Sequence, residues 1–122
     1  MRGRTRSSKT ASVTPSPIPA NAPTLALVDD DPAVRQALRF AFETQGIRVD
    51  AFADAEAALA SPRRGDWRCL VLDQRLPGMS GLDLLRQLKA EGVGAPAILI
   101  TSHPSRELAA RACEAGADIV GR

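Results

Sequence analysis

Three aspartates that follow short apolar runs are the side chains of this chain best suited to carry chemistry. Asp29 and Asp30 come directly after residues 25–28, and Asp73 comes directly after residues 69–72. Carboxylates that lie close together repel one another, so a cluster of them is costly unless a cation lies among them. Mg2+ prefers such oxygen ligands and leaves coordination positions for phosphate oxygens. Because an aspartate can itself accept a phosphoryl group, the pattern predicts a Mg2+-assisted aspartyl phosphate site.

A plainer interpretation of the first acidic cluster is also open. Asp29 to Asp31 could simply place negative charge at the positive end of a following helix. Asp73, which follows a second apolar run, favours the site over this interpretation. Thr101 follows a further apolar run, residues 97–100, and taken alone would be an ordinary strand-end residue. Its importance depends on where the predicted elements place it.

Strand-like and helix-like segments alternate along the chain. Continuous apolar runs are typical of strands that are buried on both faces of a parallel sheet, and Asp31 followed by Pro32 is typical of a helix start. The pattern predicts strands at 25–28, 47–52, 69–72, 97–100 and 119–120, and helices from 32 toward Gly46, at 54–60, around 82–88 and at 106–115.

This alternation predicts an α/β fold with a parallel sheet, right-handed crossovers and helices on both faces. Such sheets place functional groups in the crevice beyond the carboxyl ends of the strands. Asp29, Asp30, Asp73 and Thr101 all fall at predicted strand ends, and they come from three different strands. We therefore expect these four side chains to converge on one edge of the sheet.

Four segments of the sequence, in register, resemble the receiver family of two-component response regulators. They are Val28–Asp31, Leu70–Asp73 with the following Leu76–Gly81, Ile98–Ser102 and Ala115–Asp118. The resemblance covers residues 24–122. It implies a flavodoxin-like, doubly wound sheet of five strands in the order 2-1-3-4-5.

The resemblance also implies a role for each site residue. Asp73 would be the phosphoacceptor, phosphorylated by a sensor histidine kinase in a phosphorelay. Asp29, Asp30 and Asp73 would hold Mg2+ together with the main-chain carbonyl of Arg75. The Thr101 hydroxyl would bind the phosphoryl group and move inward, which is the family's switch. Such a domain autocatalyses its own phosphorylation and dephosphorylation and is not expected to be an enzyme with an external substrate.

Three features depart from the family pattern. Arg122 falls where the family places a lysine that pairs with the phosphoryl group, and arginine is a longer, planar fork with different geometry. Ile119 falls where a switch aromatic often stands. The chain stops before the family's fifth helix, so we expect a C-terminally truncated domain with an exposed apolar face.

Composition limits the remaining function classes. Four basic residues precede the first acidic one: Arg2, Arg4, Arg6 and Lys9. The chain after them carries 12 basic and 14 acidic side chains, so no basic nucleic-acid surface is expected.

Residues 1–23, rich in Pro and Ser, are predicted to be a disordered leader. No apolar run approaches the length of a membrane span, and a cytoplasmic location is expected.

The two cysteines, Cys69 and Cys113, lie far apart without a second ligand cluster, which argues against a disulfide framework or a zinc site. Both are expected to be buried, reduced thiols.

Two rival functions remain open beside the phosphoacceptor. The first is a pseudo-receiver, an interaction module that dimerises with itself or pairs with another receiver and is never phosphorylated; Arg122 and Ile119 favour it. The second is a haloacid-dehalogenase-type phosphatase, which needs a second aspartate two residues after the nucleophile, where this chain has Arg75. The cognate kinase, the pathway and any output domain are not specified by these residues.

Overall fold

The computed structural model describes residues 21–121. The predicted leader, apart from residues 21–23, and Arg122 lie outside the described residues. The strands are β1 (Thr24–Val28), β2 (Arg48–Phe52), β3 (Trp67–Asp73), β4 (Ala97–Thr101) and β5 (Ala117–Gly121). The helices are α1 (Pro32–Glu43), α2 (Ala55–Leu59), α3 (Gly81–Ala90) and α4 (Arg106–Glu114), and a short 3-10 helix spans Arg64–Asp66.

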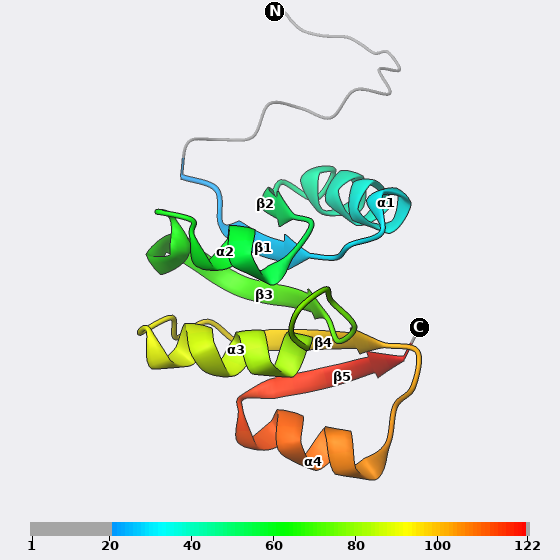
Figure 1. Ribbon diagram of the computed structural model, residues 1–122. Coiled ribbons are helices and arrows are strands. Elements are labelled where there is room, and N and C mark those ends of the chain that lie inside the picture. The colour runs from blue at the N-terminus through cyan, green and yellow to red at the C-terminus, as the bar shows by residue number, and fades with distance from the viewer. Residues whose placement is uncertain (1–20, 122) are drawn as a thin grey trace, which may run out of the picture.

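The five strands form one parallel sheet in the order β2-β1-β3-β4-β5, which confirms the predicted topology (Figure 1). The chain first winds outward from β1 to the edge strand β2, then crosses to β3 and continues to the other edge, β5. Because β1 and β3 are adjacent but separated in sequence by β2, the order reverses between them. This reversal creates the crevice beyond their carboxyl ends.

The larger core lies between the sheet and the helices α2, α3 and α4. Figure 1 shows α2 and α3 crossing in front of the strands. Four leucines of α3, at 82, 84, 85 and 88, are fully buried there, as are Leu70 and Leu72 of β3. The leucines of the helix expected around 82–88 are therefore part of the core.

The smaller core lies on the opposite face, under α1. Leu38 and Phe42 of α1 pack there against Leu25, Leu27 and Val71, yet no residue of α1 is fully buried. Farther along this face β4 presents the half-buried Ile98 and Ile100, and the neighbouring Val120 of β5 is 48% exposed. Within residues 21–121, no helix follows β5 to cover this part of the face.

The helix starts are capped as the sequence predicts. The Asp31 carboxylate accepts a hydrogen bond from the backbone N–H of Ala33 and begins α1. Asp54 caps α2 in the same way through the N–H of Ala57.

The prediction of two buried thiols was wrong for Cys113, which is exposed on α4, while Cys69 is half-buried. None of the described helices is long and apolar enough to cross a membrane.

Candidate functional site

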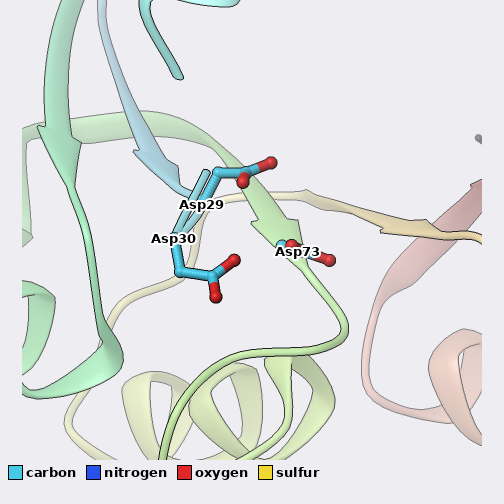
Figure 2. Close-up of side chains that lie close together, drawn as sticks. All are labelled: Asp29, Asp30 and Asp73. Carbon is cyan, nitrogen blue, oxygen red and sulfur yellow. The ribbon is translucent and has the colours of Figure 1, made fainter. Parts of the chain in front are cut away.

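Three carboxylates meet where β1 and β3 end. Val28 pairs with Leu72 in the parallel register, so the next residues, Asp29 and Asp73, lie side by side. One carboxylate oxygen each from Asp29, Asp30 and Asp73 lies within 4.8 Å of the others. Figure 2 shows the Asp29 and Asp30 side chains at the end of β1 beside Asp73 at the end of β3. The predicted convergence of these residues is confirmed.

The three carboxylates differ in their exposure to solvent. Asp29 is fully buried and Asp73 is 4% exposed, whereas Asp30 is open to solvent. Asp30 and Asp73 line an open cleft of about 750 Å³, whose walls also include Arg75, Thr101 and His103. The cleft therefore offers solvent access to Asp73 and Asp30, while Asp29 supports them from behind.

At the ends of β1, β3 and β4 the chain turns into the following loop through the same type of hydrogen bond. A side-chain oxygen of the strand-end residue accepts the backbone N–H two residues later, from Asp31 to Asp29 at 2.9 Å and from Arg75 to Asp73 at 3.1 Å. Thr101 Oγ1 accepts the N–H of His103 at 3.0 Å. Because such turns are local, they hold Asp29, Asp73 and Thr101 in defined orientations at the carboxyl ends of their strands.

Thr101 occupies the end of β4, next to β3, and is 5% exposed. Ile100 pairs with Asp73 in the register, so Thr101 lies one residue beyond the phosphoacceptor candidate on the adjacent strand. It lines the same cleft, as predicted. Arg75 also lines the cleft, but the predicted use of its carbonyl as a metal ligand stays a prediction, as do the roles of the other site residues.

The loop after β3 is held against the start of α3 by Gln74. The Gln74 carbonyl accepts the N–H of Gly81 at 3.0 Å, and its side-chain oxygen accepts the N–H of Leu82 at 2.9 Å. A Cβ built on Gly81 would lie 2.4 Å from the Asp73 carbonyl oxygen. The sequence motif Leu76–Gly81 includes this glycine, but nothing in the sequence indicates that the backbone of Asp73 needs the space beside it.

Arg35 is a second residue that sequence reasoning missed. It lies one turn into α1, and its Nη1 donates to the main-chain carbonyl of Asp29 at 2.7 Å. The spacing of six residues between Arg35 and Asp29 does not predict this contact, because the contact depends on how α1 packs against β1.

The donor set suits a hard cation. Only carboxylate oxygens converge, with no imidazole or thiolate among them, and oxygen-only sites are typical of Mg2+, Ca2+ or Mn2+. Two buried or nearly buried carboxylates beside a third would repel strongly without a positive charge among them. The residues therefore fit a divalent metal ion.

A doubly wound parallel sheet with a carboxylate cluster at its order reversal defines a class of α/β proteins that bind ligands at strand ends. Comparison with known families narrows this class: the model of the response regulator receiver domain matches residues 25–120. The chain belongs to this family and is a receiver domain of response regulators.

Curated relatives agree with this assignment. The transcriptional regulatory protein FixJ of Azorhizobium caulinodans is 41% identical over 91 residues, which is 75% of this chain and 43% of the relative. The response regulator protein TodT of Pseudomonas putida is 42% identical over 91 residues, which is 75% of this chain and 40% of that protein. The chain thus spans less than half the length of these relatives.

Solved structures agree as well. The response regulator StyR superposes with a TM-score of 0.75 at 40% identity, covering 83% of this chain and 52% of that one. The BeF3-activated DrrB receiver domain superposes with a TM-score of 0.74 at 29% identity, covering 83% of this chain and 85% of that one.

Proposed function

We propose that this chain accepts a phosphoryl group on Asp73 from a sensor histidine kinase, with Mg2+ in the acidic cluster, and so acts in a two-component phosphorelay. The observation that carries this proposal is the meeting of Asp29, Asp30 and Asp73 within 4.8 Å, with Asp30 and Asp73 lining an open cleft. Membership of the receiver family supports it.

Mg2+ would be held by Asp30 and Asp73, by the Arg75 carbonyl, and by Asp29 directly or through water. When bound, it would neutralise charge on the phosphoryl oxygens during transfer. Asp73 is the best acceptor of the three because it is both nearly buried and on the cleft wall, whereas Asp29 does not line the cleft. Burial of Asp29 instead suits a supporting ligand.

In the transfer step, a carboxylate oxygen of Asp73 attacks phosphorus, and the bond from phosphorus to the kinase histidine nitrogen breaks. The electron pair of that bond returns to the imidazole, which takes up a proton. Attack by water on the phosphorus later releases inorganic phosphate and restores the carboxylate. Since no external substrate is turned over beyond this cycle, we class the chain as a switch and not as an enzyme.

Thr101 would carry the signal away from the site. Its hydroxyl hydrogen can be donated to a phosphoryl oxygen, because the hydroxyl oxygen acts only as acceptor toward the His103 N–H. Movement of Thr101 toward Asp73 would draw the loop between β4 and α4 with it, and this loop begins at the exposed Ser102. The readout would therefore appear on the surface formed by that loop and α4.

The proposed partners are a histidine kinase and, through its surface, a second receiver or another copy of this chain. We propose a cytoplasmic location and no direct nucleic-acid contact by this domain, since its acidic side chains outnumber the basic ones from residue 29 on. The complete set of Asp29, Asp30, Asp73 and Thr101 around one cleft argues against the non-phosphorylated pseudo-receiver.

The test is the intact mass of the chain after incubation with acetyl phosphate, with and without Mg2+. We expect an increase of about 80 Da, one phosphoryl group, that requires Mg2+ and is absent in Asp73→Asn. Asp83→Asn, which changes an exposed carboxylate of α3, is the matched control and should be phosphorylated as the unaltered chain is. A folded, Mg2+-saturated sample that gains no mass would favour the pseudo-receiver.

A further inference from the structure

Arg35 reaches back from the first turns of α1 to the end of β1. Its guanidinium Nη1 donates a hydrogen bond of 2.7 Å to the carbonyl oxygen of Asp29, and the side chain is half-buried in doing so. The hydrogen bond goes to the main chain and so can orient the backbone that carries the acidic pair. A charged donor makes this hydrogen bond stronger than a neutral one.

The carbonyl of Asp29 belongs to the peptide unit that joins Asp29 to Asp30. Fixing this oxygen therefore fixes the peptide plane from which the Asp30 side chain departs. Asp30 is exposed, so packing does not hold its carboxylate in place. On either side the backbone is already anchored: Asp29 N–H donates to Phe52 O at 3.1 Å and Asp31 N–H donates to Asp29 Oδ1 at 2.9 Å. The hydrogen bond from Arg35 to the Asp29 carbonyl is the third one that holds this peptide unit in place.

We propose that Arg35 is a positioning residue for the metal site, a role that rests on the proposed Mg2+-dependent function. It acts through the Asp29 carbonyl and does not touch the metal. Groups that orient metal ligands in this way typically change metal affinity about 10- to 100-fold when they are removed.

The sign of the effect separates this role from two simpler ones. If Arg35 acted only by its charge, it would compete with a cation, and its removal would tighten Mg2+ binding. If it only stabilised the junction of β1 and α1, its removal would lower the melting temperature and leave the affinity of the folded protein for Mg2+ unchanged. Only a positioning role predicts weaker Mg2+ binding when a positive charge is taken away.

The experiment is isothermal titration of the full chain with Mg2+ alone, comparing Arg35→Gln, Arg35→Lys and the control Arg39→Gln. Arg39 lies one turn farther along α1 and forms an exposed pair with Glu43 at 3.2 Å, so its removal takes away the same charge without touching the site. We expect the dissociation constant to rise about tenfold in Arg35→Gln, to rise less in Arg35→Lys, and to stay within about twofold in Arg39→Gln.

A second readout is the rate of phosphorylation by acetyl phosphate as a function of Mg2+ concentration. Arg35→Gln should need about tenfold more Mg2+ for half-maximal rate, while the rate at saturating Mg2+ approaches that of the unaltered chain. If Arg35→Gln does not fold, Arg35→Lys decides, because lysine keeps the charge but replaces the planar fork.

Equal or tighter Mg2+ binding by the folded Arg35 variants overturns this inference and leaves the proposed function standing. Equal weakening in Arg39→Gln overturns it too, since loss of either arginine from α1, and not the contact with the Asp29 carbonyl, would then be the cause. A chain that binds Mg2+ in an Arg35-dependent way but is never phosphorylated would overturn the proposed function alone. A chain that binds no Mg2+ would overturn both.

Discussion

Asp29 and Asp73 are carboxylates removed from solvent, and the exposed Asp30 adds a third negative charge within 4.8 Å. Like charges at this separation cost free energy in the folded state, and low solvent exposure increases that cost. The chain keeps this arrangement although serine or asparagine in place of one aspartate would relieve the repulsion. A contribution to fold stability does not explain why three carboxylates lie together, whereas binding of a divalent cation does.

The first prediction concerns the stability of the chain with Mg2+. If Mg2+ binds the folded cluster and not the unfolded chain, as we propose, a concentration about 100 times its dissociation constant should stabilise the fold by about 2.7 kcal/mol. Thermal unfolding followed by circular dichroism measures this, and Asp30→Asn should remove most of the increase. An equal increase from NaCl at matched ionic strength would show charge screening instead of binding.

The second prediction concerns Gly81. In Gly81→Ala, the new methyl group would lie 2.4 Å from the Asp73 carbonyl oxygen, so β3 and α3 must move apart. We expect a loss of about 1–3 kcal/mol in the free energy of unfolding and a clear fall in Mg2+ affinity, measured by urea unfolding and titration calorimetry. Gly94→Ala, where a Cβ meets nothing within 4 Å, should change stability by less than about 0.5 kcal/mol. Full Mg2+ affinity in Gly81→Ala would contradict this account.

Among the elements, the edge strand β2 is held by side-chain contacts as well as by its backbone pairing with β1. The edge strand β2 is joined to the region before β3 by Asp50, whose carboxylate accepts Trp67 Nε1 at 2.9 Å and pairs with Arg63. Trp67 is buried and its ring lies 5.6 Å from that of Phe52. This small polar and aromatic group fixes β2 at its edge of the sheet.

The third prediction is a pH dependence that originates at Asp50. Burial alone would raise the pKa of Asp50, but hydrogen bonds from Arg63 and Trp67 outweigh it and hold the pKa below the ordinary 3.8. A lowered folded-state pKa gives stability that is present above the unfolded-state pKa and lost as pH falls through the folded-state value.

Asp50→Asn should therefore lower the free energy of unfolding by about 1 kcal/mol at pH 7, since the pair is partly exposed and screened. The difference should stay constant from pH 7 to about 5 and then shrink as the pH falls through the unfolded-state pKa toward the lower folded-state value, as followed by urea unfolding at each pH. Asp118→Asn on the exposed side of β5 should show no such trend. A constant difference across this range would mean that the ionised carboxylate is not the cause.

Most of the secondary structure was predictable from the sequence because it depends on local patterns. Apolar runs, alternating patterns and helix caps located the five strands and four α-helices of residues 21–121. Parallel strands necessarily bring Asp29, Asp73 and Thr101 to one edge. The Arg35 tether and the space at Gly81 were not predictable, because they depend on how α1 and α3 pack. The exposure of Cys113 was missed for the same reason, since an apolar neighbourhood in sequence does not specify which side of a helix faces the core.

At the scale of the whole molecule, the two faces of the sheet are unequal. Three helices, α2, α3 and α4, cover one face, whereas among residues 21–121 only α1 covers the other, where Val120 remains 48% exposed. The acidic cleft lies at the carboxyl edge between these faces, so the loops that line it border both. In the proposed mechanism, a change at Asp73 would reach α4 through Thr101 and the loop after β4.

The measurement that tests the central claim most directly is the position of the phosphoryl group in the phosphorylated chain. Borohydride reduces an aspartyl phosphate to homoserine, and tandem mass spectrometry of the digested protein then identifies the altered residue. The account predicts homoserine at position 73 only, formed only when Mg2+ was present during phosphorylation. Homoserine at Asp29 or Asp30, or a phosphoryl group on His103 with Asp73 unchanged, would contradict it.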